Sequence, residues 1–275
     1  MKLSQEVITS RRNPLVMLAA SLNDKKYREE HGLFLAMGRK LCREAVAAGA
    51  PVAHVLLSEN YASEHLDEVR ALFDGAAYRD TVLTVLSEGC FDKISTEKAP
   101  EGIILIIKHL DISKKYNKID VDNLKDVGRA ILLCSIRDPG NLGTILRSAG
   151  AFGVSTVILT DDCADVYHPR TVRAAMGAAF RVPTLRVGDV VALTAALRSL
   201  GRRVLAAELR ENAVPIAGIG LRTDDVFVIG NEGQGIPTAL SAACDASVYL
   251  PIAEQAESLN AAIAAAVILW EQAKI

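Results

Sequence analysis

The sequence lacks the short motifs that mark common nucleotide and metal sites. Its glycine clusters at 140–143 and 230–235 do not have the GxGxxG order of a dinucleotide-binding turn, and no Gly-Lys-Ser/Thr run marks a P-loop. The five cysteines are odd in number and show no CxxC spacing, which disfavours a disulfide framework and a zinc site. We therefore expect free thiols, a cytoplasmic location and no bound metal.

The sequence also lacks the signals of a secreted or membrane protein. Lys2, Gln5 and Glu6 near the N-terminus do not form the pattern of a secretory signal. The longest apolar stretch, Ala261–Trp270, is shorter than the roughly 20 residues that a helix needs to cross a bilayer. We expect no membrane partner.

Size and charge leave room for two domains and for nucleic acid. The chain has 275 residues, half of them hydrophobic, so a large buried core is possible. Its net charge is −2, but residues 1–45 hold nine Lys or Arg and only five acidic residues. A local basic patch is sufficient to bind nucleic acid, although a solvated basic face has the same composition.

The order of apolar segments predicts an α/β protein. We expect a first, smaller α/β domain at 1–110, a polar and charged linker at 111–128, and a second domain at 129–275. In the second domain short apolar strands alternate with helices, which favours a mostly parallel sheet covered on both faces. Its expected strands are 130–135, 155–160, 203–208, 226–229 and 247–250.

Three of these strands run into polar loops. The first is followed by a Pro-Gly turn, by Asn141 in a position to cap a helix, and by Arg147 on that helix. The second is followed by the glycine-rich segment 230–235, and the third by 257–260 before an Ala-rich helix. Loops at the carboxyl ends of parallel strands form the usual ligand crevice, and glycines allow close approach to the backbone. An amide and a guanidinium there suggest an anionic or hydroxyl-bearing substrate.

Taken singly, these residues have ordinary explanations. Each glycine cluster alone is typical of a turn, Asn141 of a helix cap and Arg147 of a solvated helix face. The acidic residues Asp161, Asp162 and Asp165, with His168, indicate a solvated loop. The combination of three such loops at three strand ends shifts the balance towards a ligand site.

Together the three segments resemble the SpoU (TrmH-type) family of RNA ribose 2′-O-methyltransferases, within the SPOUT superfamily. Asn-Leu-Gly-Thr-Ile-Leu-Arg at 141–147 matches the first family motif, Asn-x-Gly-x-x-x-Arg. Ile-Gly-Asn-Glu-Gly-Gln-Gly-Ile at 229–236 matches the second. Leu-Pro-Ile at 250–252 and Glu-Ser-Leu-Asn at 257–260 match the third. Motif order and spacing both agree.

The resemblance covers nearly the whole chain. Segments 8–14 and 26–34 are similar to the small RNA-binding domain of many members. This similarity implies RNA contacts from the basic residues Arg11, Arg12, Lys26 and Arg28. The departures lie in and just after the third motif, where Glu254 stands in place of a common glycine and two alanines replace the usual Val-Ser.

The resemblance implies a fold, a cofactor and partners. The fold is α/β with a C-terminal trefoil knot, and the C-terminal domain forms a homodimer. The cofactor is S-adenosyl-L-methionine, and the substrate is RNA, with ribosomal RNA favoured by the extra N-terminal domain. The residues implied to bind the cofactor are Gly230, Gly233, Leu250, Ile252 and Leu259.

The family match assigns the catalytic role to Arg147, with Asn141, Glu232, Ser258 and Asn260 as positioning groups. A guanidinium is a poor base because its pKa exceeds about 12. We therefore expect it to stabilise the developing alkoxide and to fix the neighbouring phosphate. The alternatives are a tRNA 2′-O-methyltransferase and a non-catalytic RNA-binding protein of the same fold.

Overall fold

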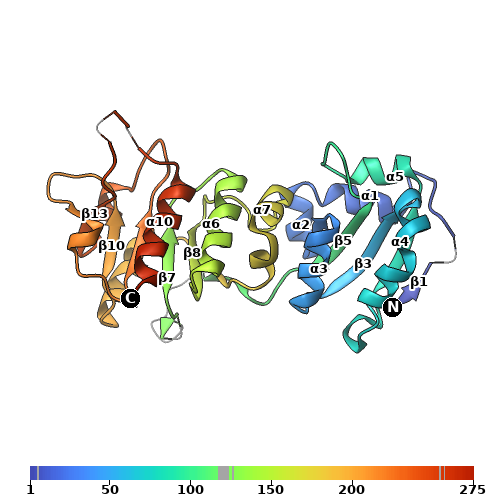
Figure 1. Cartoon of the computed structure of the whole chain (residues 1–275), viewed down its shortest axis with the longest axis horizontal. Helices are drawn as coiled ribbons and strands as arrows, with labels where there is room; N and C mark the ends of the chain where they lie inside the picture. The colour runs from blue at the N-terminus through green and yellow to red at the C-terminus, as the bar shows by residue number, and fades with distance from the viewer. Residues whose placement is uncertain (5, 117–123, 126, 254, 257) are drawn as a thin grey trace. The chain divides into compact units, whose positions relative to one another are not determined.

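The structure is a computed structural model that describes residues 1–4, 6–116, 124–125, 127–253, 255–256 and 258–275. Glu254 and the middle of the expected linker lie outside the described residues. The chain divides into two compact units (Figure 1). Unit 1 holds Met1–Leu110 and Asp165–Phe180, and unit 2 holds Asp111–Ala164 and Arg181–Ile275. The segment 165–180 thus groups with the first unit, although it lies within the second domain expected from the sequence.

Unit 1 is built on a five-stranded mixed sheet with the order β1-β4-β3-β5-β2. Strand β5 reads Ile-Ile-Leu-Ile-Ile-Lys and pairs with β3 and β2 in antiparallel fashion, and five of its six residues are buried. The strands are β1 (Lys2–Leu3), β2 (Leu33–Met37), β3 (Val52–Ser58), β4 (Val82–Leu86) and β5 (Ile103–Lys108). The helices are α1 (Pro14–Ser21), α2 (Lys25–His31), α3 (Arg39–Ala47), α4 (Glu59–Leu72), α5 (Glu88–Ile94) and α7 (Pro169–Ala175).

A buried ion pair and an aromatic stack fix the segment 165–180 within unit 1. Arg28 is 1% exposed, and its guanidinium contacts the Asp165 carboxylate at 2.8 Å. The Tyr167 ring stacks on Phe34 at 4.5 Å between centroids and on His109 at 4.3 Å. A buried charge is costly unless it is paired, so this contact specifies where the segment packs.

Unit 2 is built on an eight-stranded sheet with the order β11-β13-β10-β12-β7-β8-β9-β6. Every pairing described in it is parallel, which confirms the predicted parallel sheet. The strands are β6 (Ser113–Tyr116), β7 (Ala130–Leu133), β8 (Thr156–Thr160), β9 (Thr184–Val187), β10 (Val204–Ala207), β11 (Val214–Pro215), β12 (Val226–Ile229) and β13 (Ala246–Tyr249). The helices are α6 (Pro139–Ala151), α8 (Val190–Ser199), α9 (Thr238–Ala243) and α10 (Ala261–Ala273).

Helices cover both faces of this sheet. Leu193 and Leu197 of α8 and Leu240 of α9 pack on alternate strand residues such as Leu132 and Val228. Helices α6 and α10 pack against each other on the other face (Figure 1). This double covering explains why the strands are apolar on both sides. The trefoil knot stays a prediction.

Strand β6 lies within the stretch expected to be a linker. It pairs with β9 at the edge of the sheet, and its exposed side chains, Lys114 and Lys115, explain why it shows no apolar period. Charged side chains are typical of edge strands, because they discourage pairing with another chain. No helix among the described residues is long and apolar enough to cross a membrane.

Candidate functional site

The loops that follow β7, β12 and β13 leave the same edge of the unit 2 sheet, as expected for parallel strands. Strand β7 pairs directly with β12, so that Leu133 lies opposite Ile229. The backbone N–H of Cys134 donates to the Ile229 carbonyl at 2.8 Å, which carries the pairing one residue further. Two motifs that are far apart in the sequence therefore begin side by side.

Asn141 lies in the first turn of α6 and does not cap it. The N-cap is Asp138, whose side chain accepts a hydrogen bond from the Asn141 backbone N–H at 2.8 Å. The prediction that Asn141 caps the helix is therefore wrong. The Asp138 carboxylate, three residues earlier, takes the capping position and accepts from a backbone N–H of the first turn. As a result, the Asn141 side-chain amide can reach the other loops.

Three predicted catalytic residues form a chain of hydrogen bonds across the three loops. Asn260 caps α10, and its Oδ1 accepts from the backbone N–H groups of Ala262 at 2.9 Å and Ile263 at 3.3 Å. Its Nδ2 donates to Asn141 Oδ1 at 3.1 Å, and Asn141 Nδ2 donates to Glu232 Oε1. The cap uses the Asn260 oxygen as acceptor, so the Asn260 NH₂ group must donate to Asn141. This in turn fixes donor and acceptor at each further hydrogen bond of the series.

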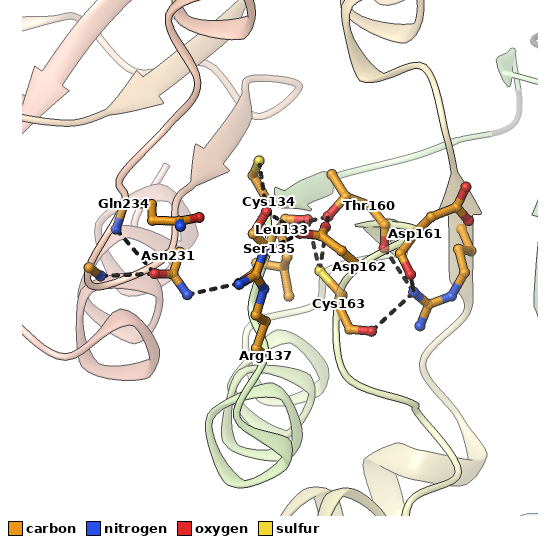
Figure 2. Close-up of polar contacts among 12 residues, drawn as sticks. Leu133, Cys134, Ser135, Arg137, Thr160, Asp161, Asp162, Cys163, Asn231 and Gln234 are labelled. Atoms are coloured by element: carbon orange, nitrogen blue, oxygen red, sulfur yellow. Dashed lines mark hydrogen bonds and ion pairs between the residues drawn. The ribbon is translucent and has the colours of Figure 1, made fainter. Parts of the chain in front are cut away.

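Asn231 joins the β12 loop to the β7 loop (Figure 2). Its Nδ2 donates to the Ser135 carbonyl at 3.0 Å. Its Oδ1 accepts from the backbone N–H groups of Gly233 at 2.9 Å and Gln234 at 3.1 Å. A single side chain thus both shapes the glycine-rich loop and connects it to the first motif.

Gly230 is required by the loop itself. A Cβ atom at this position would lie 2.5 Å from the carbonyl carbon of Gly235 and 2.8 Å from the backbone nitrogen of Ile236. The packing of the loop's own backbone is therefore sufficient to require glycine here. The contact of Gly230 with the cofactor stays a prediction.

A second polar network links the loops after β7 and β8 (Figure 2). Ser135 has a φ of 58°, which is uncommon outside glycine, and its Oγ donates to Asp162 Oδ2 at 2.6 Å. Asp162 also accepts from Thr160 Oγ1 at 2.6 Å and pairs with Arg137 at 3.2 Å. Burial raises the pKa of Asp162, but the hydrogen bonds from Ser135, Thr160 and Arg137 outweigh it and leave the pKa lowered.

The interpretation of these acidic residues as a solvated loop is wrong for Asp165, which pairs with the buried Arg28. It holds for Asp162, which is exposed, although this network gives Asp162 fixed partners. The sequence signal for Asp162 was its position just after a buried strand, because such positions lie at the edge of a parallel sheet where ligands bind. Its partners Ser135 and Arg137 come from another loop, and the sequence alone could not pair them. Among the described residues, no group of three His, Cys, Asp or Glu could hold a metal ion.

A cavity of about 480 Å³ opens beside the β13 loop. The structure brings together in its lining four of the predicted residues: Leu250, Ile252, Ser258 and Leu259. The lining is mostly apolar and also includes Glu208, which the sequence reasoning missed. Its volume is within the range of small-molecule sites. Gly230 and Gly233 are not in the lining, and Ser258 makes no hydrogen bond with the described residues.

Arg147 is exposed on α6. It makes no hydrogen bond or ion pair with any residue that the structure describes. Its guanidinium is therefore available to a substrate, in contrast to Arg137, which is paired with Asp162.

The predicted RNA-binding residues in unit 1 do not share one environment. Arg11, Arg12 and Lys26 are exposed. Arg28 is buried, and its Nε donates to Asp165 and its Nη1 to a backbone carbonyl, both at 2.8 Å. The prediction that Arg28 contacts RNA is therefore wrong, because a buried and paired guanidinium cannot reach a phosphate.

Comparison with known proteins decides the family. Residues 128–270 match the SpoU rRNA methylase family, and residues 13–105 match the MRM3-like substrate binding domain. The chain belongs to the SpoU rRNA methylase family. This result confirms the predicted family, the RNA methyltransferase class and the cofactor S-adenosylmethionine.

Relatives of this family match the chain over almost its full length. It is 30% identical over 263 residues to the Bacillus subtilis 23S rRNA (guanosine(2553)-2′-O)-methyltransferase RlmP, covering 96% of this chain and 97% of that protein. It is 31% identical over 273 residues to the Streptomyces viridochromogenes 23S rRNA (uridine(2479)-2′-O)-methyltransferase, covering 96% and 90%. The crystal structure of an AdoMet-bound rRNA methyltransferase from Sinorhizobium meliloti matches with a TM-score of 0.81 and 28% identity, covering 98% and 97%.

The two functions of Asn260 can be separated by substitution. Asn260→Asp keeps a cap oxygen for α10 but removes the donor to Asn141, whereas Asn260→Ala removes both. We expect both variants to lose about tenfold or more in methyl-transfer turnover, since a lost hydrogen bond is worth about 1–2 kcal/mol. Only Asn260→Ala should also lose about 1 kcal/mol of stability in chemical denaturation. Full turnover in Asn260→Asp would show that the chain of hydrogen bonds does not support catalysis.

Proposed function

We propose that this protein transfers a methyl group from S-adenosylmethionine to a ribose 2′-hydroxyl of ribosomal RNA. The observation that carries the proposal is the chain of hydrogen bonds from Asn260 through Asn141 to Glu232, which unites the three motif loops next to the cavity. The two relatives named above methylate 23S rRNA at ribose 2′-hydroxyls, and they favour ribosomal RNA over tRNA.

The cavity beside the β13 loop suits the cofactor. Its apolar side chains, among them Leu250, Ile252 and Leu259, fit an adenine ring, and its volume of about 480 Å³ allows a molecule of this size. When bound, S-adenosylmethionine supplies a methyl group on a positively charged sulfur. The Leu250–Ile252 segment and Leu259 would hold the cofactor, with Gly230 and Gly233 contributing backbone from the neighbouring loop.

Arg147 is the group that we assign to the substrate. A ribose hydroxyl loses its proton as it attacks, and a fixed positive charge stabilises the oxygen anion that develops. Arg147 is exposed, and no residue in the described part of the chain compensates its charge. Asn141, Glu232 and Asn260 hold the three motif loops together, and Ser258 lines the cofactor cavity. Holding hydroxyl and methyl group about 3 Å apart supplies the rest of the rate enhancement.

Unit 1 supplies contacts that bind and position the RNA. Its match to a substrate binding domain supports this assignment, and Arg11, Arg12 and Lys26 present exposed positive charge. Contacts of this kind bind phosphates without reading sequence, so they position RNA more than they specify it. We assign residues 1–110 to substrate binding and residues 129–275 to methyl transfer.

Helix α10 carries the surface that we assign to dimer formation. Ile263, Val267 and Trp270 are 54%, 37% and 52% exposed, and their spacing places them on one face of the helix. An exposed apolar face of this kind favours burial against a second copy. We also propose a cytoplasmic location, which is supported by five cysteines that are all free thiols.

The chemical identity of the product tests the proposed function. Methylation of a 2′-hydroxyl removes the internal nucleophile that cleaves RNA in alkali. We expect ribosomal RNA treated with the enzyme and S-adenosylmethionine to show one gap in its alkaline hydrolysis ladder. Untreated RNA is the control. A complete ladder together with a methylated base in the digest would contradict ribose methylation.

Removal of the Arg147 charge tests its catalytic assignment. We expect Arg147→Ala to lose about 10²-fold or more in turnover, as for other groups that stabilise an oxygen anion. Cofactor affinity, measured by calorimetry, should be unchanged because Arg147 does not line the cavity. Arg147→Lys keeps the charge and should retain part of the activity. Turnover of Arg147→Ala near that of the unchanged protein would remove the residue from the mechanism.

A charged residue on the exposed face of α10 tests the dimer. We expect the unchanged protein to sediment at twice 29.4 kDa and Trp270→Glu to sediment as a single chain. Burial of a glutamate in an apolar interface is unfavourable. Val191→Glu is the matched control, because Val191 is a similarly exposed apolar residue on α8. A monomeric unchanged protein, or a dimeric Trp270→Glu, would contradict the assignment.

A further inference from the structure

A charged side chain lies in the lining of the cofactor cavity. Of the described residues that line it, only Glu208 carries a formal charge at neutral pH. It follows β10 directly, and its backbone N–H donates to the Val248 carbonyl at 2.9 Å, which fixes it beside β13. Its side chain is only 13% exposed. A carboxylate is rarely buried to this extent unless it has partners.

The partners of Glu208 all contact one of its two oxygens. Oε1 accepts hydrogen bonds from Ser247 Oγ at 2.9 Å and from Ser241 Oγ, and Arg210 Nε lies 2.9 Å away. These contacts hold the carboxylate in one orientation. No described residue donates a hydrogen bond to Oε2. Because Glu208 lines the cavity, Oε2 is left as an acceptor for whatever occupies it.

The charge of Glu208 is already compensated within the protein. Arg210 supplies a positive charge at contact distance, so the site does not need a cation from the ligand. What the site lacks is a hydrogen-bond donor to Oε2, the carboxylate oxygen that no described residue contacts. A neutral hydroxyl donor fits this need better than an ammonium group.

We propose that Glu208 binds the ribose hydroxyl groups of S-adenosylmethionine, an inference that rests on the proposed function. The cofactor offers two adjacent hydroxyls on its ribose, and a carboxylate can accept from both. Acidic side chains bind ribose hydroxyls in the same way in unrelated nucleotide-binding folds. The hydroxyls of Ser241 and Ser247 are then positioning groups, because they hold the carboxylate in the binding orientation.

Calorimetry on the full chain tests this assignment. In Glu208→Gln the two serine hydroxyls and the nearby Arg210 guanidinium should keep the amide oxygen on the Oε1 side and leave an NH₂ group facing the ligand, which cannot accept. We expect the affinity for S-adenosylmethionine to fall about 10- to 100-fold, as for other hydrogen bonds to charged groups. Glu211→Gln is the matched control, since Glu211 is an exposed acid of the same loop without a described partner.

Two further ligands identify the group that Glu208 contacts. The analogue 5′-methylthioadenosine keeps the ribose and lacks the ammonium group, so Glu208→Gln should weaken its binding by the same factor. The 2′,3′-dideoxy analogue of the cofactor, which lacks both hydroxyls, should bind the unchanged protein more weakly, and Glu208→Gln should cause little further loss. If only S-adenosylmethionine were weakened, Glu208 would pair with the ammonium group and the ribose assignment would be wrong.

The remaining outcomes separate this inference from the proposed function. Glu208→Asp keeps the charge but withdraws the carboxylate by one carbon, so it should show a similar loss while thermal unfolding confirms that it is folded. Unchanged cofactor affinity in both Glu208 variants would overturn the ribose contact alone. Failure of the unchanged protein to bind S-adenosylmethionine would overturn the proposed function as well.

Discussion

The pairing of β7 with β12 is the contact on which the site depends. Both strands are parallel members of one sheet, so their loops leave at the same edge, and direct pairing makes the first two motifs neighbours. The hydrogen bond from Asn231 to the Ser135 carbonyl then joins the two loops outside the sheet. Without this register, Asn141 and Glu232 would not be in hydrogen-bond range.

The polar groups at this edge are arranged so that their directions are fixed. Asn260 accepts from the start of α10 and donates to Asn141, so helix capping and site assembly use opposite ends of one amide. Asp162 and Glu208 are likewise held by hydroxyl groups from neighbouring strands and loops. Preorganised groups of this kind need little rearrangement when a substrate binds, which is the main physical advantage of a rigid site.

The buried charge of Arg28 helps to hold the segment 165–180 in unit 1. The sequence places 165–180 within the family match at 128–270, yet the pairing of Arg28 with Asp165 and the ring stack around Tyr167 bind this segment to the other unit. The chain therefore passes between the two units at 110/111, 164/165 and 180/181. Dividing the chain at the single boundary 110/111 would separate Arg28 from Asp165. Each would then lose its charged partner, which is costly for buried groups.

The sequence by itself determined the fold class, the family and most of the candidate site, because motif order and strand periodicity are local properties. It could not determine that Asp138 caps α6 and frees Asn141, that the loop's own backbone fills the space beside Gly230, or that Arg28 is buried. Nor could it find Glu208 or the partners of Asp162, because those contacts come from other strands and loops. Only the tertiary structure decided these points, since burial and pairing arise from contacts between segments that the sequence keeps apart.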